Sequence, residues 1–534
     1  MKNNNRLALS IIYVLCGLFC SCSDEGRILL YQGVNYEVSG GKAYAIGTDF
    51  GSYYDIIVYH NVNGYEVVGI TDSAFAGKEK LREVKIEEGI KSIGRYAFAN
   101  CIELDEIYLP NSLDSISACS FKNCKKLKQI ILPNSLVYIG DSAFYDTELE
   151  KISFPKKLKE IGKYAFAECE LWKGGALCFP EGLTKIEEGA FDQGGYSEVI
   201  FPTSLEYIGK RAFHHHSMNS LYITENIKHI GEQAFGACTV YKIDISPYNK
   251  DFIVKDGCLL SKDKKRLILA TKAAVVNNVL KIPDGVEIIE KDGIFIGYDW
   301  TDVKKVNLPN TLKKLSQGSV FTYGCYYDLK QFHIPASVEC IEEKVFNGDL
   351  SFASFDVEPA NKYFCSQDGV LYNKSKTRLI IYPPKSQRKK FVIPSTVESI
   401  DSCAFKDCDN LHTIDFNEVK VIGSETCKRS WGIEEFICLH TDTIKYDAFD
   451  FCAVISRPKK IHLLLGRDIK YLNAHAFLSG EPSCIVCYAE EPPYIDGENL
   501  NTEKDCKIYV PLQSVYSYQR DEKWGKFKIY PIQQ

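Results

Sequence analysis

The amino-acid sequence predicts a mainly β solenoid, in which coils of about 22–25 residues stack on one another. Three observations lead to this fold class. An Ala-Phe pair recurs at a regular spacing, an apolar-x-apolar triplet before proline precedes it, and a second apolar pair lies between the two. One coil of this length cannot bury its own apolar face, so neighbouring coils must stack to form a continuous core.

The clearest landmark is the repeat phenylalanine. Over the first eight coils, successive copies are 22 to 25 residues apart, at Phe75, Phe98, Phe121, Phe144, Phe166, Phe191, Phe213 and Phe235. Weaker copies follow at Phe295, Phe321, Phe346, Phe405, Phe449 and Phe477, with Cys427 at this position in one coil. We expect these side chains to point inward and the rings of successive coils to stack.

Each coil is expected to begin with a short strand. In Ile107-Tyr108-Leu109-Pro110, alternation would turn Ile107 and Leu109 toward the core and Tyr108 outward. Proline would end the strand, because it has no N–H to donate to the ladder. A glycine follows the second apolar pair, where we expect it to permit a tight bend. These glycines are Gly94, Gly140, Gly162, Gly209 and Gly231.

Composition and motifs exclude several classes of function. The chain has 534 residues, and its 64 Lys+Arg and 70 Asp+Glu give a net charge of −6, so there is no basic excess for nucleic-acid binding. No P-loop, nucleophile elbow or HExxH motif is present. The carboxylate pairs Glu187-Glu188 and Glu342-Glu343 precede repeat phenylalanines and are expected to be solvated turns. We predict no enzyme activity, no cofactor and no metal site.

The N-terminus predicts export. Residues 1–21 are interpreted as a signal peptide, because the apolar stretch Leu7–Phe19 is too short to span a bilayer. The segment resembles a bacterial lipoprotein cleavage site with Cys22 as the lipidated residue, and Asp24 and Glu25 resemble the surface-export signal of Bacteroidetes lipoproteins. The resemblance implies a lipid anchor in the outer membrane, with the protein facing outward. The alternatives are simple secretion and a periplasmic orientation.

The repeat residues resemble the BspA-type leucine-rich repeat family of bacterial cell-surface proteins, over roughly residues 60 to 534. The resemblance implies a leucine-rich repeat solenoid with two β-hairpin inserts and terminal caps. Residues 256–268 match residues 368–380 at an offset of 112, and each is interpreted as a hairpin insert, with turns at Lys262–Lys264 and Lys374–Lys376.

The predicted order along the chain follows from these features. After the signal peptide come a lipid-anchor linker with a β-rich N-terminal cap (22–60), a first repeat array (61–245), a hairpin insert (246–280), a second array (281–356), a second insert (357–391), a third array (392–486) and a C-terminal cap (487–534). Caps are required because an open solenoid end exposes core.

Cysteine is frequent, with 21 copies. Six lie three residues after a repeat phenylalanine: Cys101, Cys124, Cys169, Cys238, Cys408 and Cys452. A position fixed by the repeat is most simply a small core residue, and its thiol is expected to serve the backbone of the neighbouring coil. We predict mostly free thiols. Strand alternation should put Ile485 and Cys487 on one face and Cys484 on the other, and His214-His215-His216 is expected to be an exposed turn.

The outward residue of each short strand is the candidate binding position, on the face expected to be concave. This phase selects Lys85, Tyr108, Ile131, Ser153, Cys178, Ile200, Tyr222, Asp244, Asn307, His333 and Asp415. Such an array is extended and varied, and family members are implicated in attachment to host matrix proteins or other bacteria. We therefore expect a non-enzymatic binding or adhesion protein with a protein or glycan ligand at the cell surface.

Two other functions stay open. One is a structural or accessory lipoprotein of an outer-membrane complex, and the less favoured one is a hydrolase. The outward residues also have an alternative interpretation, since they would serve only the sheet if a neighbouring loop covered them.

Overall fold

The computed structural model describes residues 25–49, 53–169, 175–294, 303–319, 329–346, 352–450, 460–477, 481–498 and 500–533. The predicted signal peptide and Cys22 lie outside these ranges. The chain divides into two compact units, unit 1 (Met1–Phe213) and unit 2 (His214–Gln534). The division falls inside the predicted first array.

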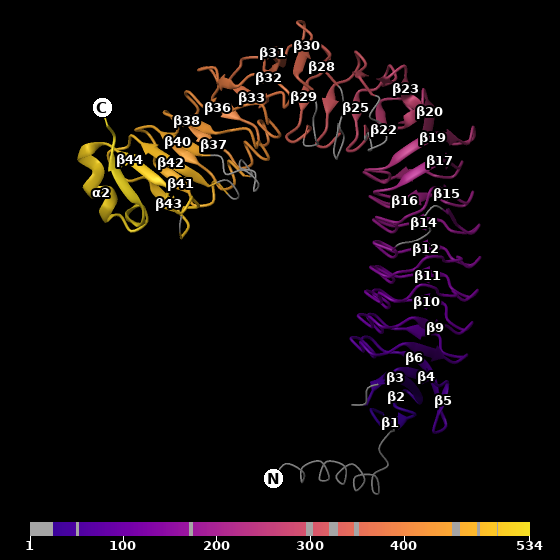
Figure 1. Cartoon of the computed structure of the whole chain (residues 1–534). Coiled ribbons are helices and arrows are strands. Elements are labelled where there is room, and N and C mark those ends of the chain that lie inside the picture. Colours follow the sequence, from indigo (N-terminus) through magenta and orange to yellow (C-terminus); the bar gives the residue numbers. More distant parts are fainter. Residues whose placement is uncertain are drawn as a thin grey trace, which may run out of the picture. The chain divides into compact units, whose positions relative to one another are not determined.

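Strands make up 35% of the chain and helices 3%, so the predicted β-solenoid fold is confirmed. Figure 1 shows the strands of each unit as successive rungs. Most coils contribute strands to two faces. The long-strand face consists of the strands that begin the coils, and the short-strand face consists mostly of two-residue strands ahead of the repeat phenylalanines. Both ladders are parallel between coils, because each coil returns to the same side before the next begins.

In unit 1 an antiparallel meander precedes the coils and becomes parallel where β3 meets β6. Its strands are β1 (Ile28–Tyr31), β2 (Val34–Ser39), β3 (Lys42–Thr48), β5 (Asn61–Val62) and β6 (Tyr65–Ile70). The long-strand face holds β4 (Asp55–Val58), β7 (Glu83–Ile86), β9 (Glu106–Tyr108), β13 (Ala176–Cys178) and β15 (Glu198–Ile200). The short-strand face holds β8 (Ser92–Ile93), β10 (Ser115–Ile116), β11 (Tyr138–Ile139), β12 (Glu160–Ile161), β14 (Lys185–Ile186) and β16 (Tyr207–Ile208).

Unit 2 repeats the plan with more interruptions. Its long-strand face holds β17 (Ser217–Ile223), β19 (Thr239–Ile245), β24 (Val279–Lys281), β26 (Lys305–Asn307), β28 (Gln331–Ile334), β30 (Ser354–Val357), β34 (Lys390–Val392), β36 (Thr413–Asp415), β38 (Glu435–Cys438), β40 (Ile461–Leu465), β42 (Pro482–Cys487), β44 (Lys507–Val510) and β45 (Lys528–Pro531). Its short-strand face holds β18 (His229–Ile230), β25 (Ile288–Ile289), β27 (Lys314–Leu315), β29 (Cys340–Ile341), β35 (Ser399–Ile400), β37 (Val421–Ile422), β39 (Thr443–Ile444), β41 (Tyr471–Asn473) and β43 (Tyr494–Asp496).

Both hairpin inserts form three-stranded antiparallel meanders in unit 2. The first consists of β20 (Phe252–Lys255), β21 (Cys258–Ser261) and β22 (Arg266–Ala270), followed by η1 (Lys272–Ala274) and β23 (Val275–Val276). The second consists of β31 (Phe364–Gln367), β32 (Val370–Asn373) and β33 (Arg378–Ile381). The third strand of each meander joins the short-strand face, where β22 pairs with β25 and β33 with β35.

The repeat phenylalanines of unit 1 form one stack of nearly parallel rings, as predicted. Centroids of successive rings from Phe75 to Phe213 are 5.1–5.5 Å apart, and the planes differ by at most 10°. All seven side chains are fully buried. The core of unit 1 therefore runs along the coils as a column and not as a single centre.

The turn around each Ala-Phe pair has a conformation that the sequence did not reveal. Residues two before and two after the phenylalanine take positive φ, as at Tyr96 (57°) and Asn100 (60°) around Phe98. The N–H groups of all three residues then point the same way, and they donate to Ala118, Ser120 and Lys122 of the next coil. This third ladder holds the phenylalanine column in register.

The repeat glycines do not permit a tight bend, so the predicted reason for glycine at these positions is wrong. None of Gly94, Gly140, Gly162 and Gly209 takes the left-handed conformation that favours glycine in a bend. Instead, the backbone of the preceding coil lies against them. A Cβ atom at Gly140 would lie 2.6 Å from the backbone N of Ala118, and the other three are equally crowded. Glycine is needed here for close approach of two backbones.

Three of the six cysteines that follow the repeat phenylalanines serve the neighbouring coil, as predicted. Cys101, Cys124 and Cys169 are fully buried. Each Sγ donates, at 3.0–3.2 Å, to the carbonyl of the repeat phenylalanine in the coil before, which is Phe75, Phe98 or Phe144 respectively. Burial raises the pKa of all three thiols. Cys238 and Cys408 differ, because each Sγ donates to the carbonyl two residues earlier in its own coil. Cys452 lies outside the described residues.

The C-terminal cap covers the last coil with η2 (Leu512–Ser514), α2 (Val515–Arg520) and η3 (Trp524–Lys526). Trp524 and Tyr518 are fully buried there, and Trp524 Nε1 donates to the carbonyl of Pro493 at 2.8 Å. Ile485 and Cys487 are buried on one face of β42, as predicted, and Cys484 is half-buried. Among the described residues, no helix is long and apolar enough to cross a bilayer.

Candidate functional site

The outward stripe is the set of outward-facing residues along the long-strand face. In unit 1 all the predicted members are exposed: Lys85, Tyr108, Ile131, Ser153, Cys178 and Ile200. Strand pairing places Lys85 beside Tyr108 and Cys178 beside Ile200. Among the described residues of unit 1 no loop buries these six side chains, so the stripe is open to a partner.

A groove opens in the middle of this stripe. β9 is the last strand of the sheet β4-β7-β9, and the next coil contributes only an isolated bridge between Gln129 and Lys151. A cavity of about 570 Å³ lies between the two coils, lined by residues 105–109, 126 and 128–131. On the opposite side of the same coils, the rings of Phe121 and Phe144 stay 5.3 Å apart. The long-strand face is therefore open while the phenylalanine column stays closed.

Two apolar side chains dominate the groove. Tyr108 is 52% exposed and Ile131 is 87% exposed, the largest exposed fraction recorded for a large apolar residue. Leu109, predicted to face the core, is only half-buried, because β9 ends at Tyr108. An exposed apolar patch of this kind is characteristic of interaction surfaces.

Polar groups surround the apolar centre of the groove. The hydroxyl of Tyr108 donates to Glu106 Oε2 at 2.7 Å, and this hydrogen bond to a carboxylate raises the pKa of Tyr108. On the facing coil, Lys126 pairs with Glu103 at 2.8 Å and Lys128 lies 3.5 Å from Glu150. Long cationic side chains beside an exposed Tyr and Ile give a rim that can pair with a polar partner while the centre is dehydrated.

In unit 2 the stripe begins with a tyrosine and continues with polar residues. Tyr222 is 48% exposed and lies opposite Asp244 in the strand register. The Asp244 carboxylate forms an ion pair with Lys242 at 2.6 Å. His333 Nδ1 lies 2.7 Å from Asp356 Oδ2 on the neighbouring strand. Asn307 and Asp415 are half-buried, so these two are less accessible than the sequence predicted.

Unit 2 contains a second apolar run that was not predicted from the sequence. Strand register extends the outward stripe from Asp415 across β38, β40, β42, β44 and β45. The residues added are Ile437, Leu464, Val486, Tyr509 and Tyr530. The rings of Tyr509 and Tyr530 have centroids 5.6 Å apart. Alternation within Phe436-Ile437-Cys438 and its successors could have identified them, but β38, β40 and β42 lack the proline that follows the earlier strands.

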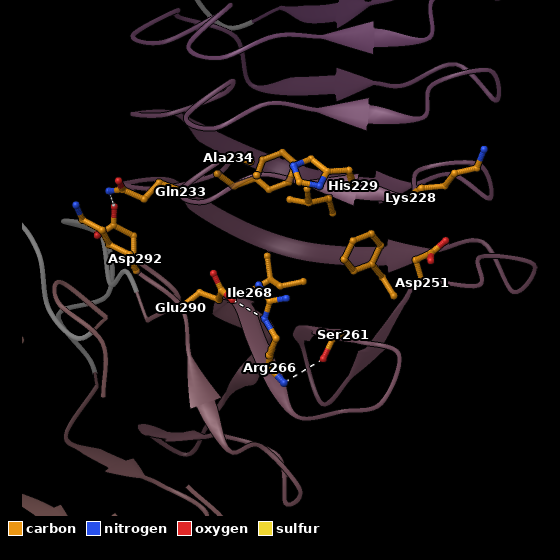
Figure 2. A pocket seen from close by; sticks show the side chains of 16 residues that line it. Lys228, His229, Gln233, Ala234, Asp251, Ser261, Arg266, Ile268, Glu290 and Asp292 are labelled. Atoms are coloured by element: carbon orange, nitrogen blue, oxygen red, sulfur yellow. Dashed lines mark hydrogen bonds and ion pairs between the residues drawn. The ribbon is translucent and has the colours of Figure 1, made fainter. Parts of the chain in front are cut away.

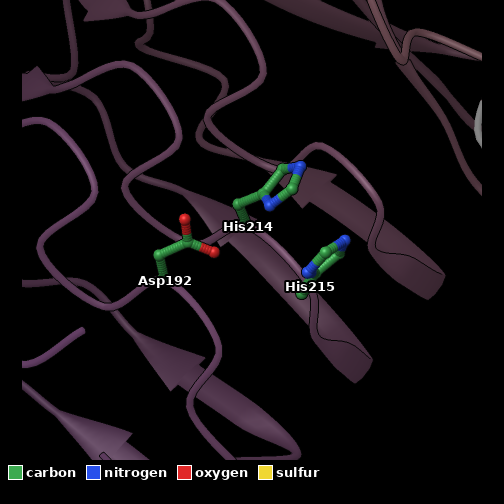
Figure 3. A group of neighbouring side chains, drawn as sticks. All are labelled: Asp192, His214 and His215. Atoms are coloured by element: carbon green, nitrogen blue, oxygen red, sulfur yellow. The ribbon is translucent and has the colours of Figure 1, made fainter. Parts of the chain in front are cut away.

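The three consecutive histidines are not an exposed turn, which corrects the prediction. His214 and His216 are 3% and 4% exposed, and only His215 faces solvent. Figure 3 shows the rings of His214 and His215, whose centroids are 4.1 Å apart. Asp192, drawn with them, belongs to unit 1, so we assign the three residues no common site.

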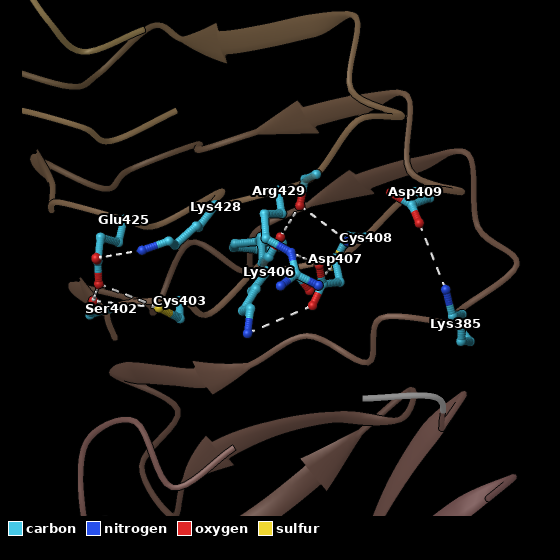
Figure 4. Close-up of polar contacts among 12 residues, drawn as sticks. Lys385, Ser402, Cys403, Lys406, Asp407, Cys408, Asp409, Glu425, Lys428 and Arg429 are labelled. Atoms are coloured by element: carbon cyan, nitrogen blue, oxygen red, sulfur yellow. Dashed lines mark hydrogen bonds and ion pairs between the residues drawn. The ribbon is translucent and has the colours of Figure 1, made fainter. Parts of the chain in front are cut away.

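The charged turns of unit 2 are paired clusters. In Figure 4, Glu425 accepts a hydrogen bond from Lys428 at 2.8 Å. Glu425 also accepts one from Lys344 at 2.7 Å. These bonds lower the pKa of Glu425 to about 2. Nearby, Arg429 Nε lies 2.8 Å from Asp407. A carboxylate with such a pKa carries no proton at neutral pH and is no candidate for general acid chemistry.

Comparison with known proteins identifies the family. The model of the BspA-type leucine-rich repeat region matches residues 60–173, 175–256, 276–387 and 384–456, in six copies. The chain belongs to the BspA-type leucine-rich repeat family. The predicted resemblance extended to residue 534, whereas the match to the BspA-type model ends at 456. A search of curated proteins found no match.

Several solved structures resemble this BspA-type chain. The leucine-rich repeat protein TpLRR of T. pallidum is 25% identical, over 34% of this chain and 85% of its own, with a TM-score of 0.31. A leucine-rich repeat protein from Bacteroides ovatus is 18% identical, over 95% of this chain and 100% of its own, with a TM-score of 0.31. The pneumococcal vaccine antigen PcpA is 14% identical, over 96% of this chain and 100% of its own, with a TM-score of 0.35.

Proposed function

We propose that this protein is a surface-anchored, non-enzymatic binding or adhesion protein whose outward stripe contacts a protein or glycan on a host or microbial surface. The observation that carries the proposal is the groove of unit 1, where Tyr108 and Ile131 are exposed at the centre of a polar rim. Large aromatic and aliphatic side chains that become dehydrated on contact supply most of the energy in protein interfaces.

The anchor belongs to the same proposal. Acylation of Cys22 would hold the chain at the outer membrane by burying methylene groups, with no membrane-spanning helix. The repeat array would then project from the anchor and present the outward stripe. Membership of the BspA-type family supports a repeat-based binding protein, and the charge and motif content of the sequence offers no competing chemistry.

The location is tested by treating intact cells with proteinase and following the protein by immunoblot, in wild-type and Cys22→Ala strains. We expect digestion of the wild-type protein on intact cells and loss of the variant from the membrane fraction. Protection of the wild-type protein until the cells are lysed would place it in the periplasm, and adhesion would be rejected.

The binding face is tested with the Cys22→Ala form, which keeps the whole repeat array. This protein is applied to immobilised matrix proteins and to a glycan array, and each positive surface is tested again with Tyr108→Ala. We expect at least about thirtyfold weaker binding, as for a hot-spot aromatic residue. Tyr138→Ala is the matched control, because Tyr138 is an exposed tyrosine of unit 1 on the short-strand face. Equal effects of the two substitutions would refute the assignment of the groove.

A further inference from the structure

The two hairpin inserts of unit 2 are built alike but leave different spaces. In each insert the third strand pairs with the short strand of the following coil, β22 with β25 and β33 with β35. The sheet that contains β22 ends at β29. Neither β22 nor β33 pairs with the short strand that precedes its insert, β18 or β29. Each insert therefore separates two coils that would otherwise be neighbours.

The space at the second insert is filled. It measures about 20 Å³, and the side chain of Lys344 lines it and reaches Glu425 at 2.7 Å. The equivalent space at the first insert measures about 250 Å³. There the residue 111 positions before Lys344 is Gln233, and Gly318 takes the place of Glu425. The first insert thus lacks both the lysine that fills the second space and the carboxylate that holds it.

The open pocket is lined by polar groups that are fixed in position, as Figure 2 shows. Arg266 Nε donates to Glu290 Oε1 at 2.7 Å, and Gln233 Nε2 donates to Asp292 Oδ2. Asp292 is 2% exposed, so its carboxylate is held within the wall. At the second insert the arginine and its acid are kept, as Arg378 and Asp401, while Cys403 replaces Asp292.

One backbone donor also faces this gap. In unit 1, an N–H two residues before a repeat phenylalanine donates to the next coil, as that of Gly189 (φ 61°) does to the carbonyl of Lys210. At Gln233, which has the same left-handed conformation (φ 56°), the N–H has no partner among the described residues. The insert has moved away the coil that would accept this hydrogen bond.

The composition of the lining selects the chemistry of a ligand. Three basic and three acidic residues line the pocket, so their formal charges balance: Lys228, Arg266, Lys291, Asp251, Glu290 and Asp292. A phosphate or an acidic peptide would meet as many repulsive as attractive groups. A neutral polyhydroxyl ligand matches both kinds, because each hydroxyl donates to a carboxylate and accepts from a guanidinium or an amide. Phe235, Phe252 and Ile268 add an apolar portion for the C–H face of a ring.

We propose that this pocket binds one sugar residue of a glycan. Its volume suits a single ring and excludes a longer oligosaccharide from full burial. Asp251 and His229 are exposed at its edge, so the rest of the glycan chain leaves through solvent. The pocket shares no residue with the outward stripe, so it is a second site and does not depend on the groove of unit 1.

The test uses the soluble Cys22→Ala protein, titrated calorimetrically with D-galactose, D-mannose, N-acetyl-D-glucosamine and inorganic phosphate. We expect one or more of the sugars to bind with a Kd on the order of 1 mM, as for a ligand of this size. Gln233→Lys installs the residue that fills the second insert and should weaken sugar binding at least about tenfold. Lys344→Gln is the matched control and should leave binding unchanged.

Three outcomes would overturn the proposal: binding of phosphate alone, binding of none of the three sugars, or equal sugar affinity in wild type and Gln233→Lys. If Gln233→Lys does not fold by circular dichroism, Asp251→Ala replaces it. Asp251 is an exposed residue at the pocket edge, and its loss should weaken sugar binding without affecting the core. Unchanged binding in that variant would also reject the pocket.

Discussion

The phenylalanine column makes a quantitative prediction about the substitution Phe121→Ala. Phe121 is fully buried, and its ring stacks on Phe98 at 5.4 Å and on Phe144 at 5.3 Å. Removing a buried phenylalanine side chain costs about 3–5 kcal/mol through lost transfer energy and the remaining cavity. Phe121 also loses two aromatic pairs of about 0.5–1.5 kcal/mol each, which places it at the upper end of that range, about 4–5 kcal/mol.

Phe75 provides the matched comparison. Its side chain is also fully buried, but its ring stacks on only one other described ring, that of Phe98. Phe75→Ala should therefore cost about 1 kcal/mol less than Phe121→Ala, the value of one aromatic pair. Phe121→Leu keeps most of the apolar volume and should cost clearly less than either.

Hydrogen exchange followed by mass spectrometry is the appropriate assay, because repeat proteins unfold locally as well as globally. For Phe121→Ala we expect protection of amides in residues 98–144 to fall by about a thousandfold, at 1.4 kcal/mol per factor of ten. Unchanged exchange in this segment would show that the repeat phenylalanine does not carry the core. Equal losses for Phe75→Ala and Phe121→Ala would refute the stacking contribution.

Three further predictions follow from the same geometry. Gly140→Ala should destabilise unit 1 by about 1–3 kcal/mol in urea unfolding, since its Cβ would lie 2.6 Å from the backbone of Ala118; a neutral result would contradict the close approach. The paired Glu425 has a pKa of about 2 against an ordinary 4.5, so it stabilises the folded protein above pH 4.5 and loses this effect as the pH falls toward 2. The shift corresponds to at most about 3 kcal/mol, reduced to about 1–2 kcal/mol by partial exposure, and Glu425→Gln should flatten the stability profile over this pH range. Buried Cys124, with its raised pKa, should resist iodoacetamide in the folded protein at pH 8 while exposed Cys178 reacts; comparable rates by peptide mapping would place Cys124 at the surface.

Much of the architecture could be predicted because the repeat places equivalent residues one coil apart. A residue type that recurs every 22–25 positions meets its own copies in the neighbouring coils, so the inward direction of Phe121 and the backbone contact of Cys124 follow from spacing alone. The exposure of Tyr108 follows from strand alternation by the same local argument. For these residues, sequence position and environment are directly linked.

The groove and the pocket depend on distances between coils, which the repeat pattern does not contain. Residues 129–133, Gln-Ile-Ile-Leu-Pro, are nearly the same pattern as residues 106–110, Glu-Ile-Tyr-Leu-Pro, yet the two segments do not pair as strands. The inserts likewise share their hairpin motif, yet the space lined by Gln233 measures about 250 Å³ and the one lined by Lys344 about 20 Å³. Sequence by itself determined the period, the inward face and the outward stripe, because these are contacts between neighbours in the repeat. The tertiary structure decided where the stack opens, because the tilt between coils and the filling of a gap result from the packing of many side chains together.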